Sequence, residues 1–267
     1  LEHEYVRWLR RHGSFDRLVP DEVCRNARRA ILGRITMLDD YLGRILGLLK
    51  ETGLDEDTIV VYTSDHGDMM GEHGLWFKNA AYDWSSRVPL IISGPGIPAQ
   101  RLSEVVSLLD LGATLCALAG IEPAYAVSDG RDLEPLVRGH RAEEDGLAIM
   151  ENYAEGVWRG WRMIRQGPWK MTVVPGEQPE LFNVFDDPNE WHDRASDPAC
   201  REIRDRLEAT ALRNWDQDGC DERRWQSEER RLAILKTKQQ FHWQAPSPPV
   251  PHPLRGKAGS KIDNVAI

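Results

Sequence analysis

The residues with the clearest chemical potential lie in one short stretch, SDHGD at positions 64–68, directly after an apolar β-branched run. Asp65 offers a hard carboxylate and His66 an imidazole nitrogen, a pair that suits a divalent cation accepting mixed oxygen and nitrogen ligands. Gly67 lets the backbone turn sharply beside them. Because an Asp-His pair alone is more often an ordinary turn, the pair by itself indicates only a candidate metal site.

A second candidate is the loop EHGLWFK at positions 72–78, which contains His73 and Lys78 between glycines and aromatic residues. A lysine supplies three donors and a compact charge, which match the oxygens of a phosphate or sulfate. The plain alternative is a surface lysine beside two core aromatics. The residue types alone favour that plain alternative.

Both stretches need strands and helices to position them. The run TIVVYT at 58–63 predicts a buried strand that ends at the Asp-His pair, and the apolar run 88–92 predicts a second strand. Apolar residues at three- and four-residue spacing predict a helix over 23–50, which Gly53 ends. Ligands of open α/β sheets bind at the carboxyl ends of strands, which is where Asp65 and His66 fall.

Further along, residues 105–108 predict a third strand, and Asp110 is a plausible N-cap for a helix over 111–119 that Gly120 ends. This order of helix, strands and helix predicts an α/β layer fold. Asp83 and Arg87 flank the second strand, and we expect them to form a structural ion pair.

After about Gly139 the pattern changes to short strands at hairpin spacing, separated by Gly-Pro and Pro-Gly turns. The predicted strands cover 147–151, 158–165, 169–174 and 180–185. Charged helices are predicted over 198–215 and 221–235, and the proline-rich segment from 241 lacks periodicity. We expect the tryptophans of this sheet to pack in the core; a carbohydrate platform is the alternative.

Composition excludes several functions. The net charge of 34 − 43 = −9 makes nucleic acid an unlikely partner, since phosphate repels an acidic protein. No apolar run approaches the length of a membrane span. The four cysteines are scattered without a C-x-x-C pair, which excludes a zinc knuckle and is compatible with a reducing, cytoplasmic location. We interpret the basic cluster Arg25, Arg28 and Arg29 as a solvated helix face.

Taken together, the ordered stretch 58–96, from TIVVYTSDHGD through EHGLWFK to RVPLIISGPG, resembles the sulfatase family of the alkaline-phosphatase superfamily. The helix with LDD at 38–40 and the segments ELFN at 180–183 and DDPNE at 186–190 match the same family. A long ordered match is far more specific than its single motifs. It resembles the choline-sulfatase, arylsulfatase and phosphonate-monoester-hydrolase branches. Many sulfatases have Asn at the position of His66, and a histidine there is seen in the choline-sulfatase and phosphonate-monoester-hydrolase branches.

The resemblance implies specific roles. Asp65 and His66 become ligands of one divalent metal ion, calcium or manganese, with zinc a further alternative because of the histidine. Lys78 becomes the catalytic residue that contacts the ester oxygens of a small sulfate-ester substrate. The resemblance also implies that His73 is a candidate substrate-binding residue.

It also implies an organisation. Residues 1–139 would be the carboxyl-terminal part of a sulfatase catalytic domain, with an alkaline-phosphatase-like sheet sandwiched by helices. Residues 140–240 would be a small subdomain with an antiparallel sheet and helices, and 241–267 an irregular tail. The resemblance further implies a homo-oligomer at full length.

One family feature is missing. The family's nucleophile is a formylglycine made in a C/S-x-P-x-R motif, and none of the cysteines or serines here has Pro two and Arg four residues later. The family's amino-terminal aspartate pair is also absent. We therefore expect the carboxyl-terminal part of a sulfatase that is inactive alone. The alternatives are a phosphonate or phosphate ester hydrolase on the same scaffold, and a non-catalytic relic with an interaction role.

Overall fold

The computed structural model of the chain describes residues 3–13, 19–122, 129–140, 146–153, 157 and 159–240. Trp158 and the predicted tail, 241–267, lie outside these residues. Helices and antiparallel strands are mixed along the chain, which confirms the predicted α/β class. Within the described residues no helix is both long and apolar enough to cross a bilayer.

The chain divides into two compact units, residues 1–221 and 222–267. The division at 139 and 240 that the sequence suggests stays a prediction. The boundary falls inside helix α7 (Gln217–Gln240), so most of this helix belongs to the second unit. The residues of α7 from 222 to 237 are mostly exposed.

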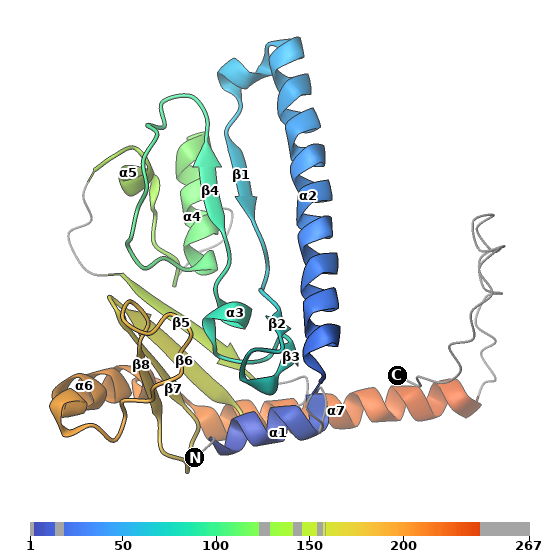
Figure 1. Cartoon of the computed structure of the whole chain (residues 1–267), viewed down its shortest axis with the longest axis vertical. Helices are drawn as coiled ribbons and strands as arrows, with labels where there is room; N and C mark the ends of the chain where they lie inside the picture. The colour runs from blue at the N-terminus through green and yellow to red at the C-terminus, as the bar shows by residue number, and fades with distance from the viewer. Residues whose placement is uncertain are drawn as a thin grey trace. The chain divides into compact units, whose positions relative to one another are not determined.

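Helix α2 (Asp21–Thr52) confirms the helix predicted from the apolar spacing. Two acidic residues occupy its first turn and Lys50 its last, which suits the helix dipole. Gly53 ends it in the left-handed region at φ 71°, where its N–H donates to the carbonyls of Leu49 and Lys50. A short 3₁₀ turn, η1 (Leu54–Asp57), then reverses the chain (Figure 1).

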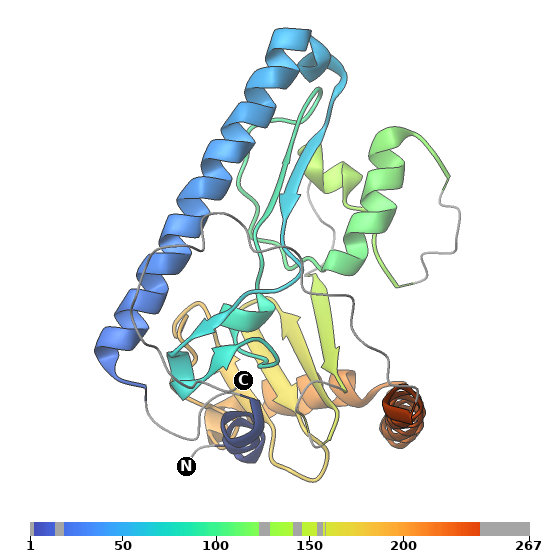
Figure 2. The ribbon, with the colours of Figure 1, turned by 90° about the vertical axis from the view of Figure 1, so that its right-hand side faces the viewer.

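Strand β1 (Val60–Thr63) pairs antiparallel with β4 (Leu90–Ser93), with Val61 opposite Ile92. These two strands confirm the strands predicted at 58–63 and 88–92, but the predicted burial of the first is wrong, because all four residues of β1 are only half-buried. Helices α2 and α4 lie on opposite sides of the β1–β4 pair, which gives the layered arrangement seen in Figures 1 and 2.

Helix α4 (Leu108–Ala119) begins earlier than predicted. Ser107 is the N-cap, and Asp110, the predicted N-cap, is the third helical residue; its carboxylate accepts from the Ser107 N–H at 2.9 Å and completes a capping box. The strand predicted at 105–108 is wrong, because Ser107 caps the helix that Leu108 begins. Gly120 ends α4, as predicted.

The segment between β1 and β4 contains four short elements, which are β2 (Met69–Met70), η2 (Glu72–Gly74), β3 (Trp76–Phe77) and α3 (Asp83–Ser86). A further short helix, α5 (Glu134–Val137), follows α4. Strands β2 and β3 pair with each other.

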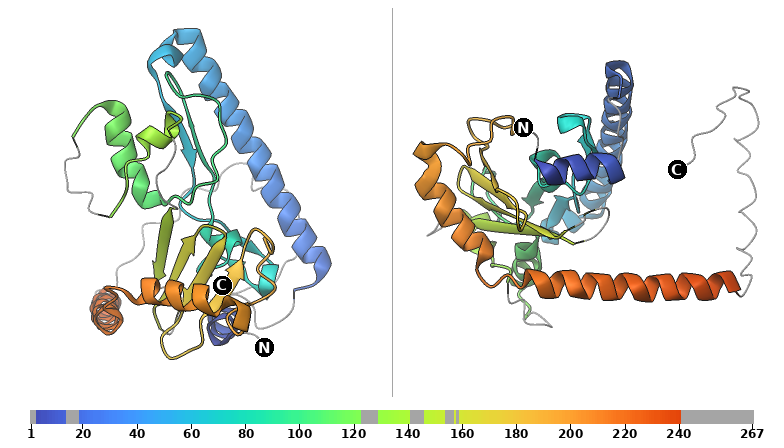
Figure 3. Two further views of the ribbon diagram at one scale, coloured as in Figure 1. Left: turned by 90° about the vertical axis from the view of Figure 1, so that its left-hand side faces the viewer. Right: turned by 90° about the horizontal axis from the view of Figure 1, so that it is seen from below.

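The second part is a four-stranded antiparallel sheet in the order β5-β6-β7-β8, which confirms the predicted hairpins. The strands are β5 (Leu147–Asn152), β6 (Trp161–Gln166), β7 (Trp169–Val173) and β8 (Glu180–Asn183). The short η3 (Pro198–Cys200) leads into α6 (Arg201–Leu212), which covers one face of this sheet. Figure 3 shows α6 on that face and α1 with the β2–α3 segment on the other.

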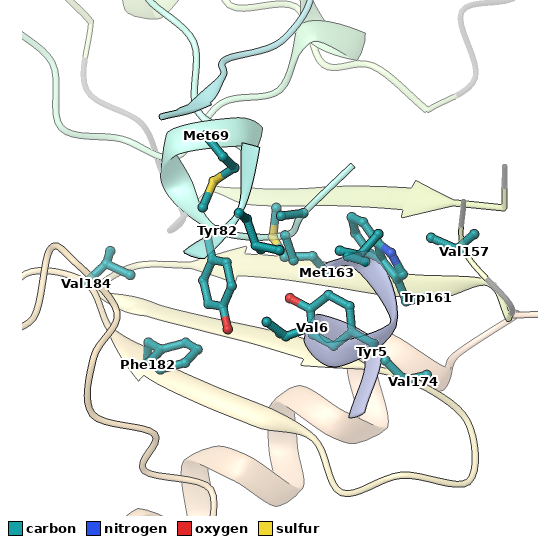
Figure 4. Close-up of a cluster of buried hydrophobic side chains, with 14 residues drawn as sticks. Tyr5, Val6, Met69, Tyr82, Val157, Trp161, Met163, Val174, Phe182 and Val184 are labelled. Atoms are coloured by element: carbon teal, nitrogen blue, oxygen red, sulfur yellow. The ribbon is translucent and has the colours of Figure 1, made fainter. Parts of the chain in front are cut away.

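Helix α1 (Glu4–Gly13), which the sequence pattern did not predict, closes the second face. Its Tyr5, Val6 and Leu9 are buried in a cluster with Trp161 and Met163 of β6. Figure 4 shows Tyr5 and Val6 over the same face of the sheet as Tyr82 and Met69 from the β2–α3 segment. Trp161 is fully buried, so the predicted core role of this tryptophan is confirmed.

Candidate functional site

The loop after β1 has no room for a side chain at Gly67. A Cβ there would lie 2.1 Å from the carbonyl oxygen of Trp84, on α3. The Gly67 N–H donates to the carbonyl of Ser85 at 2.8 Å, which fixes the loop against α3. The Ser64 hydroxyl donates to the carbonyl of His66 at 2.9 Å. Glycine is therefore required at 67 by close backbone contact and not by an unusual φ.

This loop orients the two predicted metal ligands toward each other. His66 Nδ1 lies 2.8 Å from the carbonyl oxygen of Gly67. Because a carbonyl only accepts, Nδ1 must carry the proton, and Nε2 keeps a lone pair in neutral histidine. Nε2 lies 3.5 Å from Oδ2 of Asp65. The two ligand atoms thus share one side of the loop.

Asp65 carries the charge that a cation needs. Its side chain is 84% exposed. Slight desolvation opposes ionisation, but hydrogen bonding from the His66 N–H and the nearby imidazole lower the pKa of Asp65 below its usual value. The carboxylate is therefore ionised at neutral pH.

The donor set fits part of a divalent cation site. One carboxylate oxygen and one imidazole nitrogen with a hydrogen-bonded second nitrogen match how metals are usually held. Across the part of the chain that the structure describes, no group of three or more His, Cys, Asp or Glu side chains is arranged around one point. Asp65 and His66 can supply two ligands, and the remaining ones must come from elsewhere.

Lys78 lies at the end of a loop with unusual backbone geometry. Its two neighbours, Phe77 and Asn79, have φ values of 66° and 79°, in the left-handed region. Non-glycine residues in this region are uncommon and concentrate at functional sites. Lys78 itself is half-buried.

Two arginines anchor this loop to the helices. Arg10 of α1 donates to the carbonyl of His73 at 2.7 Å, and Arg28 of α2 pairs with Glu72 at 2.6 Å. Arg25, Arg28 and Arg29 are all exposed, which confirms the predicted solvated helix face, and Arg28 additionally forms an ion pair with this loop. The other carboxylate oxygen of Glu72 accepts from the N–H of Met70 at 2.6 Å.

His73 has a packed environment. Its ring is stacked on Tyr82 at 3.9 Å between centroids and on Trp191 at 4.3 Å. Its Nε2 lies 3.0 Å from the carbonyl oxygen of Asn189, and burial lowers the pKa of the imidazole. These contacts occupy both faces of the ring and one nitrogen, and none of them is with Asp65 or His66.

A pocket of about 700 Å³ opens beside the predicted ligands. Asp65 and His66 line it together with Asp83 of α3 and two cations of the sheet, Arg165 and Lys170. His73 and Lys78 are not among the described residues that line it. The structure thus brings the two predicted metal ligands to one pocket and adds charged residues that the sequence did not single out.

The most buried of these is Lys170, with a side chain only 1% exposed. Its Nζ lies 2.7 Å from Oδ1 of Asp83, 2.8 Å from Oε1 of Glu190 and 3.2 Å from the Ser86 hydroxyl. The other Glu190 oxygen accepts from the Asp83 N–H at 2.6 Å. Arg87 lies 3.8 Å from Asp83, which confirms the predicted ion pair.

This buried network holds α3 against the sheet and so supports the loop of His66. Sequence reasoning missed Lys170 and Glu190. The available signal was weak: a lysine at an inward position of a predicted strand, and an acid in a loop.

Comparison with known proteins places these features in a family. The family profile described as Sulfatase matches residues 6–121, and the one described as N-sulphoglucosamine sulphohydrolase, C-terminal matches residues 71–217. The second match covers more than half of the chain and includes Lys78, α3 and the whole sheet.

Relatives found by sequence and by structure belong to the same family as these profiles. The choline-sulfatase of Rhizobium meliloti (strain 1021) is 36% identical over 84% of this chain and 44% of its own length. A solved 2-O GAG sulfatase is 29% identical, with a TM-score of 0.67 over 77% of this chain and 47% of its own. The phosphonate monoester hydrolase of Agrobacterium radiobacter is 30% identical, with a TM-score of 0.59 over 67% of this chain and 39% of its own.

The chain thus spans less than half the length of these relatives. What it does span contains the ordered motif of residues 58–96, which lies within the first profile match, and the four-stranded sheet, which lies within the second. On these grounds the chain belongs to the sulfatase family.

Proposed function

We propose that this chain supplies part of the active site of a metal-dependent sulfatase that hydrolyses sulfate monoesters. The observation that carries the proposal is the His66 ring, whose Nδ1 is held by the Gly67 carbonyl while Nε2 faces the Asp65 carboxylate at 3.5 Å. A histidine in that tautomer beside an ionised aspartate is ready to bind a cation. Membership of the sulfatase family supplies the reaction class.

On this proposal Asp65 and His66 hold one calcium or manganese ion, whose charge would stabilise the negative charge of the sulfate group as the ester bond breaks. Lys78 contacts the ester oxygens and stabilises charge on the leaving oxygen. The left-handed backbone of both neighbours of Lys78 supports a functional role, because such conformations concentrate at functional sites.

The nucleophile has no candidate within these 267 residues, because no cysteine or serine stands in a C/S-x-P-x-R motif. The proposal therefore assigns the formylglycine and the remaining metal ligands to sequence outside the printed chain. It predicts cation binding by this chain without turnover.

Metal binding can be tested directly by calorimetric titration of the chain with Ca²⁺ and with Mn²⁺. Asp65→Asn and His66→Ala should each weaken binding by about tenfold or more, since each removes a ligand. His140→Ala, at an exposed histidine, is the matched control and should bind as wild type does. Equal affinity in wild type, Asp65→Asn and His66→Ala would rule out this site.

A phosphonate or phosphate ester hydrolase is the second candidate, favoured by the similarity to the Agrobacterium enzyme. The two are separated by kinetics of the full-length protein with phenyl sulfate and with phenyl phenylphosphonate. A larger kcat/KM for phenyl sulfate supports the sulfatase, and the opposite order supports the phosphonate enzyme.

A further inference from the structure

The pocket beside Asp65 and His66 contains a cation that the proposed reaction does not use. Arg165 of β6 lines this pocket. Alternation along β6 directs Met163 toward α1 and the β2–α3 segment, and Ile164 toward α6. Arg165 has the same parity as Met163, so its side chain leaves the sheet on the pocket side.

The guanidinium of Arg165 has a donor without a hydrogen-bond partner among the described residues. Its Nη1 is buried and has no hydrogen-bond partner in the part of the chain that the structure describes. The guanidinium lies over the ring of Phe185 at 5.4 Å, a contact that orients the group without using its donors. A buried donor without an acceptor costs free energy, and an incoming acceptor would recover it.

Arg162, the other arginine of β6, has the hydrogen bonds expected of a structural residue. Arg162 points to the α6 side, where its Nε donates to Glu151 at 2.7 Å and its Nη1 to the carbonyl of Ala211 at 2.7 Å. Arg162 thus has a carboxylate and a backbone partner. Arg165, three residues later on the opposite face, lines a pocket, and its buried Nη1 has no acceptor among the described residues.

Among the described residues that line the pocket, the cations Arg87, Arg101, Arg165 and Lys170 stand against the carboxylates Asp65, Asp83 and Glu104. Arg165 lies directly opposite Lys170 in the β6–β7 register, and like charges at such positions repel. The two carboxylates nearest to Lys170, those of Asp83 and Glu190, are already within 2.8 Å of its Nζ. Burial lowers the pKa of Arg165, which the charges of Asp83 and Glu190 only partly oppose.

We propose that Arg165 is a specificity-determining residue that binds a second oxyanion on the substrate, a carboxylate or a second sulfate, beside the ester sulfate. The planar guanidinium matches either oxyanion through two parallel hydrogen bonds. The inference rests on the proposed function, because it places the reacting ester at the cation held by Asp65 and His66, which line the same pocket as Arg165.

The described lining of this pocket contains no aromatic cage for a quaternary ammonium group. Such cations are recognised by cages of several aromatic rings. Phe185 and Trp84 contribute aromatic rings near α3, but of these only Phe185 lines the pocket with Asp65 and His66. Trp161 is fully buried in the core and cannot contribute. A choline-like leaving group would therefore meet Arg165 without a cage of described aromatic residues.

The test is an NMR titration of the chain labelled with ¹⁵N-arginine, in 0.15 M salt with the cation that binds best. The probes are phenyl sulfate and its 2-, 3- and 4-carboxylated derivatives. We expect at least one carboxylated ester to bind roughly 10- to 100-fold more tightly than phenyl sulfate. That ester alone should shift the guanidinium signals of Arg165, which are identified by their loss in Arg165→Gln.

Variants separate recognition from general charge. Arg165→Gln should abolish the preference for the carboxylated ester, measured as the ratio of its affinity to that of phenyl sulfate. Arg165→Lys, which keeps the charge but loses the planar fork, should retain only part of the preference. Arg34→Gln removes an exposed cation of α2 and should behave as wild type does.

The possible failures are distinct. If phenyl sulfate binds and no carboxylated ester binds more tightly, or if the preference survives in Arg165→Gln, the role of Arg165 is refuted while the proposed function stands. If none of the four esters binds, the proposed function fails and the role of Arg165 fails with it.

Discussion

Replacing Lys170 by methionine should destabilise the chain more than any surface substitution. The change keeps an unbranched side chain that is one atom shorter, and removes the charge that lies 2.7 Å from Asp83 and 2.8 Å from Glu190. The Glu190 side chain is 1% exposed, so its carboxylate would be left buried without a cation. Removing one partner of a buried ion pair costs about 3–5 kcal/mol.

That cost sets the size of the measurable effect. For a domain of this size, 1 kcal/mol corresponds to a shift of about 2–4 °C in Tm, so Lys170→Met should melt roughly 6–20 °C lower. Thermal unfolding followed by circular dichroism measures the shift. Lys236→Met, which removes an exposed lysine of α7, is the control and should change Tm by less than about 2 °C.

The pH dependence of the stability of Lys170→Met tests whether the buried charge of Glu190 causes the loss. Burial already raises the pKa of Glu190, and Lys170 opposes that rise. Without Lys170 the folded state should bind a proton at Glu190 more tightly than the unfolded state does. The stability deficit of Lys170→Met should then be small at pH 5 and grow as the pH rises to 8.

A second substitution gives the decisive comparison. Lys170→Met with Glu190→Gln removes the stranded charge and should recover more than half of the lost stability at pH 8. A deficit below 1 kcal/mol, equal at pH 5 and pH 8 and unchanged by the second substitution, would refute the reasoning. In that case the ion pairs would contribute nothing to holding α3.

Two other changes probe the site and the core. Gly67→Ala would place a Cβ 2.1 Å from the Trp84 carbonyl oxygen, so we expect a loss of about 1–3 kcal/mol in urea unfolding and weaker cation binding by calorimetry; wild-type values would contradict the close contact. Burial raises the pKa of Glu180 from 4.5 to about 8. The folded state therefore keeps a proton that the unfolded state loses, and stability falls as the pH rises from about 4.5 through 8. This loss is at most about 5 kcal/mol, since each pKa unit corresponds to about 1.4 kcal/mol. Glu180→Gln should remove it, and parallel stability curves for the variant and wild type between pH 5 and 9 would refute the assignment.

Local patterns predicted the parts of the fold that local interactions decide. Gly53 and Gly120 end their helices because a left-handed residue satisfies the last carbonyls, and this requires only neighbours in the sequence. The strand before Asp65 is marked by its β-branched run. The start of α4 was harder, because Ser107 and Asp110 are both good caps. The structure uses them together, and so the apolar run at 105–108 is not a strand.

The features that the sequence did not predict, helix α1 and the Lys170–Asp83 ion pair, depend on contacts between residues far apart in the chain. The ten residues of α1 are too few to form a stable helix alone. The helix is stabilised by burying Tyr5, Val6 and Leu9 on a sheet that begins more than 130 residues later. Lys170 and Asp83 are 87 residues apart. Neither residue has a local pattern that distinguishes a buried ion pair from two surface charges.

These long-range contacts matter most at His66, whose ring is useful to a cation only in one orientation. That orientation depends on the Gly67 carbonyl, which depends on the contact of Gly67 with Ser85 of α3. Helix α3 is in turn fixed by the contacts of Asp83 and Ser86 with Lys170 of β7. The small sheet therefore positions a ligand on a different strand pair. It follows that Lys170→Met should weaken cation binding at Asp65 and His66 even at pH 5, where the chain regains stability, and unchanged binding there would show that the loop holds His66 unaided.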